Sequence, residues 1–293
     1  MEKKKIIVTG CNGQLGRAIS RELAGDDRYE LTGCDVTADV KLDITDTDEV
    51  MRFAEEISPE AIINCAAYTA VDRQETDSDL SMKINAIGPR NLAIAASRTG
   101  AKLMHISTDY VFSGEGEEPW TEEDPYQPKN VYGLSKLQGE IAVRSLMKRY
   151  FLLRTSWVFG LHGRNFVRTM RQLGRERNEI RVVDDQVGSP TYTVDLARVI
   201  CNMIPTEKYG IYHVCNSGWM SWAHFAELIM AEEMLRCKVT PVPTSEYPTP
   251  AHRPLNSRMS TRKLNEAGFG PMPGVEDALH RYLQELAAEQ REG

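Results

Sequence analysis

Short apolar runs alternate with longer segments of helical periodicity through the first half of the chain. The apolar runs predict buried strands at residues 6–9, 31–34, 61–65, 103–107 and 151–155. Apolar residues three or four positions apart predict helices at 14–23, 50–56, 80–97 and 131–150. Regular alternation of strand and helix predicts right-handed crossovers and an α/β fold, a Rossmann-type, doubly wound parallel sheet.

The second half of the chain is less regular. Helical patterns occur at 166–173, 194–203, 222–230 and 278–288, and strand-like runs at 180–183 and 211–214. Five prolines among the seventeen residues 241–257 predict an ordered loop without helix or central strand. We expect a dinucleotide-binding domain from 1–156 plus about 183–210. A smaller, discontinuous α/β substrate domain would comprise about 157–182 plus 211–293.

Charge and cysteine spacing exclude several classes of protein. The formal net charge is -7, whereas a nucleic-acid-binding surface needs a basic stripe. The start of the chain has no apolar run long enough for a signal peptide or a membrane span. The six cysteines are isolated from one another, which predicts free thiols, no zinc site and a cytoplasmic location.

Three glycines follow the first predicted strand and open the first predicted helix. Gly10, Gly13 and Gly16 have the spacing Gly-x-x-Gly-x-x-Gly. Glycine permits a sharp turn and lets a pyrophosphate approach the free N–H groups at a helix N-terminus. We therefore expect a dinucleotide here, although a glycine-rich turn without a ligand is the alternative.

Two aspartates are candidates for the adenosine half of the cofactor. Asp35 ends the second strand, where a carboxylate accepts hydrogen bonds from a ribose hydroxyl and repels the extra phosphate of NADPH. The segment KLDIT offers Asp43 and Ile44 for the adenine. Both aspartates could instead be simple turn formers. The charge at Asp35 favours NADH without excluding NADPH.

The segment NVYGLSK places Tyr132 four residues before Lys136 at the start of a long helix. These two side chains share one helix face, and Thr108 ends the neighbouring fourth strand at the edge where ligands bind. A free tyrosine has a pKa of about 10, so we expect the Lys136 ammonium, aided by the positive ring of the cofactor, to lower the pKa of Tyr132. Tyr132 would then donate a proton to a carbonyl oxygen that Thr108 also holds.

The chain resembles the dTDP-4-dehydrorhamnose reductase family of extended short-chain dehydrogenases/reductases. The resemblance covers nearly the whole chain and is carried by GCNGQLG, NCAAYTAVDRQE, STDYVFSG, NVYGLSKLQGE, LRTSWVFG, NFVRTM, DDQVGSPTY and VPTSEYPTPAHRPLNSR. It implies reduction of the C4 ketone of dTDP-4-dehydro-β-L-rhamnose with NADPH or NADH.

The resemblance also implies roles for individual residues. Tyr132 would be the proton donor, Lys136 its partner and Thr108 the carbonyl ligand. The residues implied near the sugar are Asp109, Tyr110 and Trp157. Those implied at the cofactor are Gln14, Leu15, Ala66, Ala67 and Tyr68, with Tyr132 and Lys136. Arg253 and Arg258 pair either with the substrate diphosphate or with a structural partner.

One departure concerns magnesium. Some relatives bridge two subunits through magnesium held by carboxylates, one of them near the start of the first helix. This chain has Arg17, Ala18 and Val194 where acids would help. We therefore expect no metal, and a monomer or a homodimer without a metal bridge.

Three alternative functions remain. A 4,6-dehydratase needs an Asp-Glu pair beside the threonine, whereas here Asp109 is followed by Tyr110. An epimerase cannot be recognised from local residues. A non-catalytic, cofactor-binding subunit resembling the regulatory subunit of methionine adenosyltransferase could retain Thr108, Tyr132 and Lys136.

Overall fold

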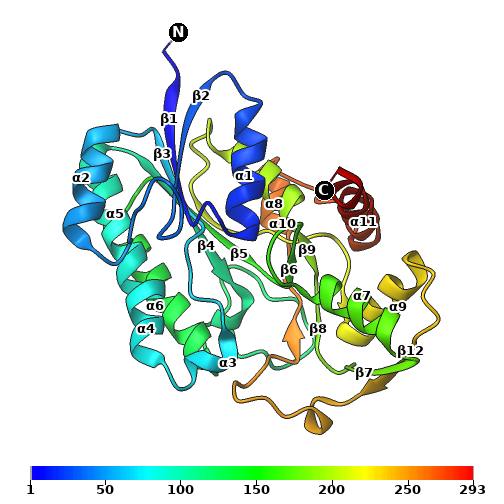
Figure 1. The fold of residues 1–293 in the computed structure, drawn as a ribbon. Helices are drawn as coiled ribbons and strands as arrows, with labels where there is room; N and C mark the ends of the chain where they lie inside the picture. Colours follow the sequence, from blue (N-terminus) through cyan, green and yellow to red (C-terminus); the bar gives the residue numbers. More distant parts are fainter. Residues whose placement is uncertain (1, 293) are drawn as a thin grey trace.

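The computed structural model describes residues 2–292, and its largest element is a six-stranded parallel sheet (Figure 1). Its strands are β1 Lys4–Thr9, β2 Tyr29–Cys34, β3 Ala61–Asn64, β4 Lys102–Thr108, β5 Tyr150–Thr155 and β10 Gly210–His213. They lie in the order β10-β5-β4-β3-β1-β2, and every neighbouring pair is parallel. The strand order reverses between β1 and β3, which is where such sheets open a ligand crevice. The predicted doubly wound α/β fold is confirmed.

Helices cover both faces of this sheet (Figure 1). The helices are α1 Gln14–Ala24 and α8 Thr193–Met203 on one face, and α2 Thr47–Ile57, α5 Gly88–Thr99 and α6 Val131–Leu146 on the other. Ile19 of α1 and Ile200 of α8 are fully buried against the first face. Among residues 2–292, every helix is too short or too polar to cross a bilayer.

A second hydrophobic core lies beside the sheet, around Phe159, Phe225 and Tyr282. Three helices surround it: α7 Phe166–Glu176, α9 Trp222–Glu232 and α11 Val275–Glu292. Its short strands are β6 Val158–Phe159, β7 Glu179–Val183, β8 Val187–Gly188, β9 Thr191–Tyr192, β11 Met220–Ser221, β12 Lys238–Val242 and β13 Asn256–Ser257. They pair as β6-β9, β12-β7 and β11-β8-β13.

The helix predicted at 80–97 is three pieces. It consists of α4 Ser78–Met82, a π-helical turn at Lys83–Ile87 and α5. Pro89 has no N–H to donate to the carbonyl of Asn85 four residues earlier, which favours the wider turn. Gly139 of α6 packs directly on that carbonyl, because an added Cβ would lie 2.3 Å from Asn85 O. The helix predicted at 131–150 also ends early, at Leu146.

The boundary predicted at residue 210 is too early. The strand predicted at 211–214 is the edge strand β10 of the main sheet, where it pairs with β5. Helix α10, Arg262–Glu266, also contributes Leu264 to the core of that sheet. Apolar pattern alone could not show which sheet these segments join. The division of the rest of the chain into two domains stays a prediction.

The proline-rich segment 241–257 crosses the carboxyl edge of the main sheet. It begins within β12, contains a 3₁₀ turn at Thr244–Glu246 and ends in the edge strand β13. Asn130 Nδ2 donates to His252 O at 2.8 Å, and Asn256 N donates to Gly114 O at 2.9 Å. These bonds hold the segment over the start of α6.

Candidate active site

The glycine loop after β1 is shaped by close backbone contacts. A Cβ at Gly16 would lie 2.2 Å from Gly10 O, and a Cβ at Gly10 would lie 2.5 Å from Ala66 N. Gly10 also has φ +67°, a conformation that favours glycine. The N-cap of α1, Gly13, provides no side-chain cap, and the first turn contains no acidic residue. This helix end therefore suits a dinucleotide pyrophosphate.

The adenosine-side candidates differ in their surroundings. Asp35 Oδ1 accepts from Thr37 N at 2.9 Å and from Thr37 Oγ1 at 2.7 Å, which leaves Oδ2 free of a protein partner in residues 2–292. Asp43 is exposed and makes the same turn with Thr45. Ile44 is buried in the core, where Gly88 packs against it. Asp43 therefore forms a turn, as Asp35 does, and the assignment of Asp43 and Ile44 to the adenine stays a prediction.

The remaining cofactor candidates lie around the switch point. Ala66, Ala67 and Tyr68 follow β3, and the backbone of Ala66 packs directly against Gly10. Leu15 is buried in the core under α1. Gln14 turns toward the loop before α7, since its Nε2 donates to Arg164 O at 3.3 Å.

The end of β4 carries three of the predicted site residues. The Thr108 hydroxyl donates to Asp109 Oδ1 at 2.9 Å and accepts from Tyr110 N at 3.2 Å. Asp109 is buried, and burial raises the pKa of its carboxyl to about 6, although the hydroxyls of Ser257 and Thr108 oppose the rise. Its Oδ2 has no hydrogen-bond partner within the described chain. A polar ligand would satisfy this oxygen.

Helix α6 brings Tyr132 and Lys136 to the same edge. Asn130 caps the helix by accepting from Gly133 N at 2.8 Å, and Glu75 Oε1 accepts from Val131 N at 2.9 Å. Gly133 lies against the backbone of Tyr110, because an added Cβ would come within 2.2 Å of Tyr110 O. The rings of Tyr110 and Tyr132 consequently meet edge to face, with centroids 5.3 Å apart.

The protein's own side chains raise the pKa of Tyr132, and the lowering expected with the cofactor's positive ring stays a prediction. Burial raises the pKa of Tyr132 above its ordinary value; the Thr108 hydroxyl opposes the rise, and Asp109 and Tyr110 add to it. Burial also lowers the pKa of Lys136 to about 8. The Lys136 Nζ donates to Ile106 O at 2.6 Å. Loss of hydration is therefore the main cause of both pKa shifts.

Two further candidates come from segments outside β4 and α6. Trp157 follows β5 with φ +50° and stacks on Trp222, with ring centroids 3.5 Å apart. Arg253 comes from the proline-rich segment, and its Nη2 donates to Asp72 Oδ2 at 2.7 Å. Its charge also acts on Tyr110. Arg253 thus has a structural partner and still lies beside the site.

Several polar residues of the site carry no signal in the sequence. Ser257 of β13 has a buried hydroxyl beside Asp109, and Thr155 of β5 has a buried hydroxyl without a hydrogen-bond partner within residues 2–292. Thr155 is the register partner of Thr108. His105 of β4 and His213 of β10 are fully buried. Only the pairing of distant strands reveals such neighbours.

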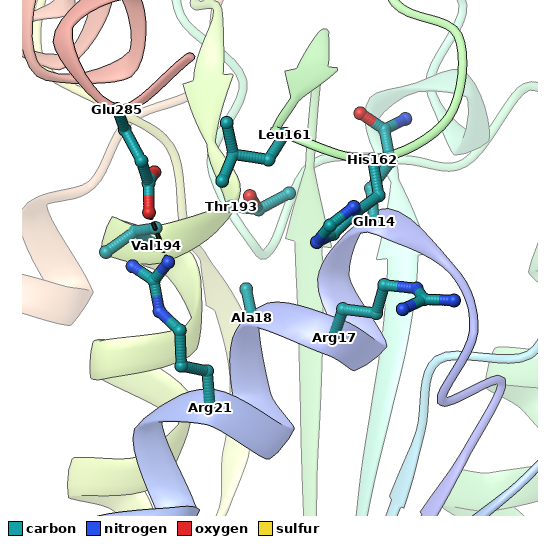
Figure 2. Close-up of a pocket in the computed structure, with 9 residues that line it drawn as sticks. All are labelled: Gln14, Arg17, Ala18, Arg21, Leu161, His162, Thr193, Val194 and Glu285. Atoms are coloured by element: carbon teal, nitrogen blue, oxygen red, sulfur yellow. Dashed lines mark hydrogen bonds and ion pairs between the residues drawn. The ribbon is translucent and has the colours of Figure 1, made fainter. Parts of the chain in front are cut away.

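The three positions where acids would favour a magnesium-bridged dimer line one pocket (Figure 2). Arg17, Ala18 and Val194 line it, together with Arg21 and Glu285. Arg21 forms an ion pair with Glu285, which links α1 to α11. Within residues 2–292 no group of three potential metal-ligating side chains was found. The expected absence of magnesium stays a prediction, which the two arginines support.

Fold and site together are those of a Rossmann-type NAD(P)-dependent oxidoreductase. Residues 4–288 match the family described as the RmlD substrate binding domain, and the chain belongs to this family. It is 43% identical to the spore coat polysaccharide biosynthesis protein SpsK of Bacillus subtilis, covering 97% of this chain and 98% of that protein.

Relatives of known name point to one activity. The chain is 39% identical to dTDP-4-dehydrorhamnose reductase of Aggregatibacter actinomycetemcomitans, covering 92% of this chain and 94% of that enzyme. The crystal structure of dTDP-4-dehydrorhamnose reductase from Bacillus anthracis in complex with NADP is 45% identical, with a TM-score of 0.93. That comparison covers 97% of this chain and 100% of the other. The predicted family is confirmed.

We predict that Gly10→Ala will lower both thermal stability and affinity for NADPH. The added Cβ meets Ala66 N and forces a side chain into positive φ, which by itself costs about 1–2 kcal/mol. Gly100→Ala is the matched control, because Gly100 has φ +74° and nothing within 4 Å of its Cβ. Fluorescence titration with NADPH and thermal melts compare the two. Equal affinities in both variants would contradict the role assigned to the loop.

We predict that Asp109→Asn will stabilise the protein increasingly as pH rises from 4 to 7. An unfolded aspartate has a pKa of about 3.9, so the raised folded pKa gives stability below pH 4 that is lost as pH rises through 6. Asparagine never ionises, and the difference in unfolding free energy should reach roughly 2–3 kcal/mol at pH 7. Urea unfolding at several pH values measures it. Asp27→Asn, at a fully exposed position, should show no such trend.

Proposed function

We propose that the protein reduces the C4 ketone of dTDP-4-dehydro-β-L-rhamnose to give dTDP-β-L-rhamnose, using NADPH or NADH. The observation that carries the proposal is the convergence of Thr108, Tyr132 and Lys136 at the carboxyl edge of β4. This convergence occurs in a chain that matches reductases of that name along nearly their whole length.

The residues present fit a nicotinamide dinucleotide. Gly10, Gly13 and Gly16 would hold the pyrophosphate, because a side chain at Gly10 or Gly16 would collide with backbone. Asp35 would hold the adenosine ribose through its free oxygen. When bound, the reduced cofactor supplies the hydride. The chain itself must therefore orient the ketone and deliver one proton to its oxygen.

Tyr132 is the proposed source of that proton. Its raised pKa keeps the phenol protonated through the neutral range, as an acid must be before the reaction. Thr108 would donate its hydroxyl hydrogen to the same carbonyl oxygen and so fix its position. As the proton leaves, the Lys136 ammonium would stabilise the phenolate in a site with little water.

We propose that substrate contacts come from both sides of the crevice. Asp109 and Tyr110 at the end of β4 would face the sugar, and Trp157 would approach from the second core. The substrate domain of about 157–182 plus most of 214–293 would hold the nucleotide. We also propose a monomer or homodimer without a metal bridge, and a cytoplasmic location, which the six free thiols support.

We predict that Tyr132→Phe will reduce turnover by about 10²–10⁴-fold with either cofactor, because general acid catalysis contributes about that much. The assay follows loss of reduced nicotinamide absorbance with dTDP-4-dehydro-β-L-rhamnose. Tyr209→Phe is the control, since that hydroxyl accepts from Arg149 at the opposite edge of the sheet. No turnover by the parent protein, together with a co-purifying enzyme subunit, would favour the binding-subunit alternative.

We predict that Arg253→Ala will raise the apparent KM for the nucleotide sugar about 10-fold or more, because a hydrogen bond to a charged group contributes roughly 1.5–3 kcal/mol. Asp72→Asn is the matched variant. It removes the charge of the partner of Arg253 without removing the guanidinium. Steady-state kinetics on both variants distinguish a contact of Arg253 with the substrate diphosphate from a purely structural ion pair with Asp72. Equal effects of the two substitutions would make Arg253 a structural residue.

A further inference from the structure

Helix α6 carries a third ionisable side chain in line with the two proposed catalytic ones. Tyr132, Lys136 and Glu140 recur at intervals of four residues, so they follow one face of the helix. The Glu140 side chain is fully buried. A carboxylate at such a position needs a reason, because burying a charge without compensation is strongly unfavourable.

The compensation comes from Arg154 on β5. Its Nε donates to Glu140 Oε1 at 2.9 Å, and its Nη2 donates to Glu140 Oε2 at 2.8 Å. The Arg154 side chain is also fully buried. The rings of Phe112 and Tyr126 lie 5.0 and 4.8 Å from its guanidinium carbon. These contacts fix Arg154, and the bidentate pair fixes Glu140.

Stability alone does not account for this pair. Two apolar side chains of similar volume would join α6 to β5 at least as well, since a buried ion pair loses its hydration on both sides. Unlike two apolar side chains, the pair supplies a charge to the neighbouring part of α6. It places a fixed negative charge one helical turn from Lys136.

Three ionisable groups around Lys136 are uncharged at neutral pH, whereas Asp109, which acts on Tyr132, has a pKa of about 6. Burial raises the pKa of the Cys65 thiol, which follows β3, to about 12. Burial and the Lys136 charge lower the pKa of His105 on β4 well below its usual value. Tyr132 keeps its proton because burial raises its pKa. Glu140 is thus the charged group that opposes the loss of the Lys136 proton.

We propose that Glu140 is a positioning residue for proton delivery, which keeps the Lys136 ammonium charged beside Tyr132 and is itself held in place by Arg154. This inference rests on the proposed reductase function and deepens it. A carboxylate two turns away from the proton donor would act through Lys136 and would touch neither substrate nor cofactor.

The test is the pH profile of kcat in Glu140→Gln. Loss of the negative charge should move the alkaline limb about one pH unit lower, which is about a fivefold loss of kcat at pH 8 with little change near pH 6. Glu233→Gln is the matched control. It disrupts the largely buried pair with Arg171 in the second core and should lower the melting temperature without moving the limb.

A second readout does not need turnover. In protein labelled with ¹³C at lysine Cε, the Lys136 resonance, assigned by its loss in Lys136→Met, should titrate at lower pH in Glu140→Gln. If Glu140→Gln fails to fold, the double variant Glu140→Gln, Arg154→Gln removes both charges and should show a smaller shift in the same direction. An unchanged Lys136 titration in a folded variant would overturn the proposal. Absence of turnover in the parent protein, with the expected NMR shift, would instead contradict the reductase function alone.

Discussion

Exclusion of water from the carboxyl edge of β4 is the constraint on which the rest of the site depends. It raises the pKa of Asp109 and Tyr132 and lowers that of Lys136. A Tyr132 phenol that keeps its proton and a Lys136 ammonium with a pKa of about 8 are suited to delivering a proton to a ketone. The same groups in water would have their ordinary pKa values and much weaker mutual interactions.

Close backbone packing produces this exclusion. Glycines at 133 and 139 let α6 lie directly against Tyr110 and the π-helical turn, so that the helix seals the edge from one side. The proline-rich segment seals it from the other, where Asn130 and Gly114 bond its backbone. Trp157, which stacks on Trp222, and Arg253 of the proline-rich segment are the candidates at the rim. Fold and chemistry are therefore linked through a few points where only glycine fits.

The sequence predicts the main sheet and the positions of Thr108, Tyr132 and Lys136, because periodicity and spacing are local properties of the chain. It does not predict that Lys83–Ile87 forms a π-helical turn or that residues 211–213 join the main sheet. The sequence also does not predict the ion pair between Glu140 and Arg154. The pair joins α6 to β5, and no local sequence pattern around either residue indicates which residue it contacts.

The most direct test of the account follows the hydride itself. The protein would be incubated with dTDP-4-dehydro-β-L-rhamnose and a reduced cofactor deuterated at the transferred position, and the sugar product examined by NMR. The account predicts one deuterium on C4 of the product and an equal amount of oxidised cofactor. Conversion of the sugar without deuterium at C4, or without oxidation of the cofactor, would contradict reduction of the C4 ketone.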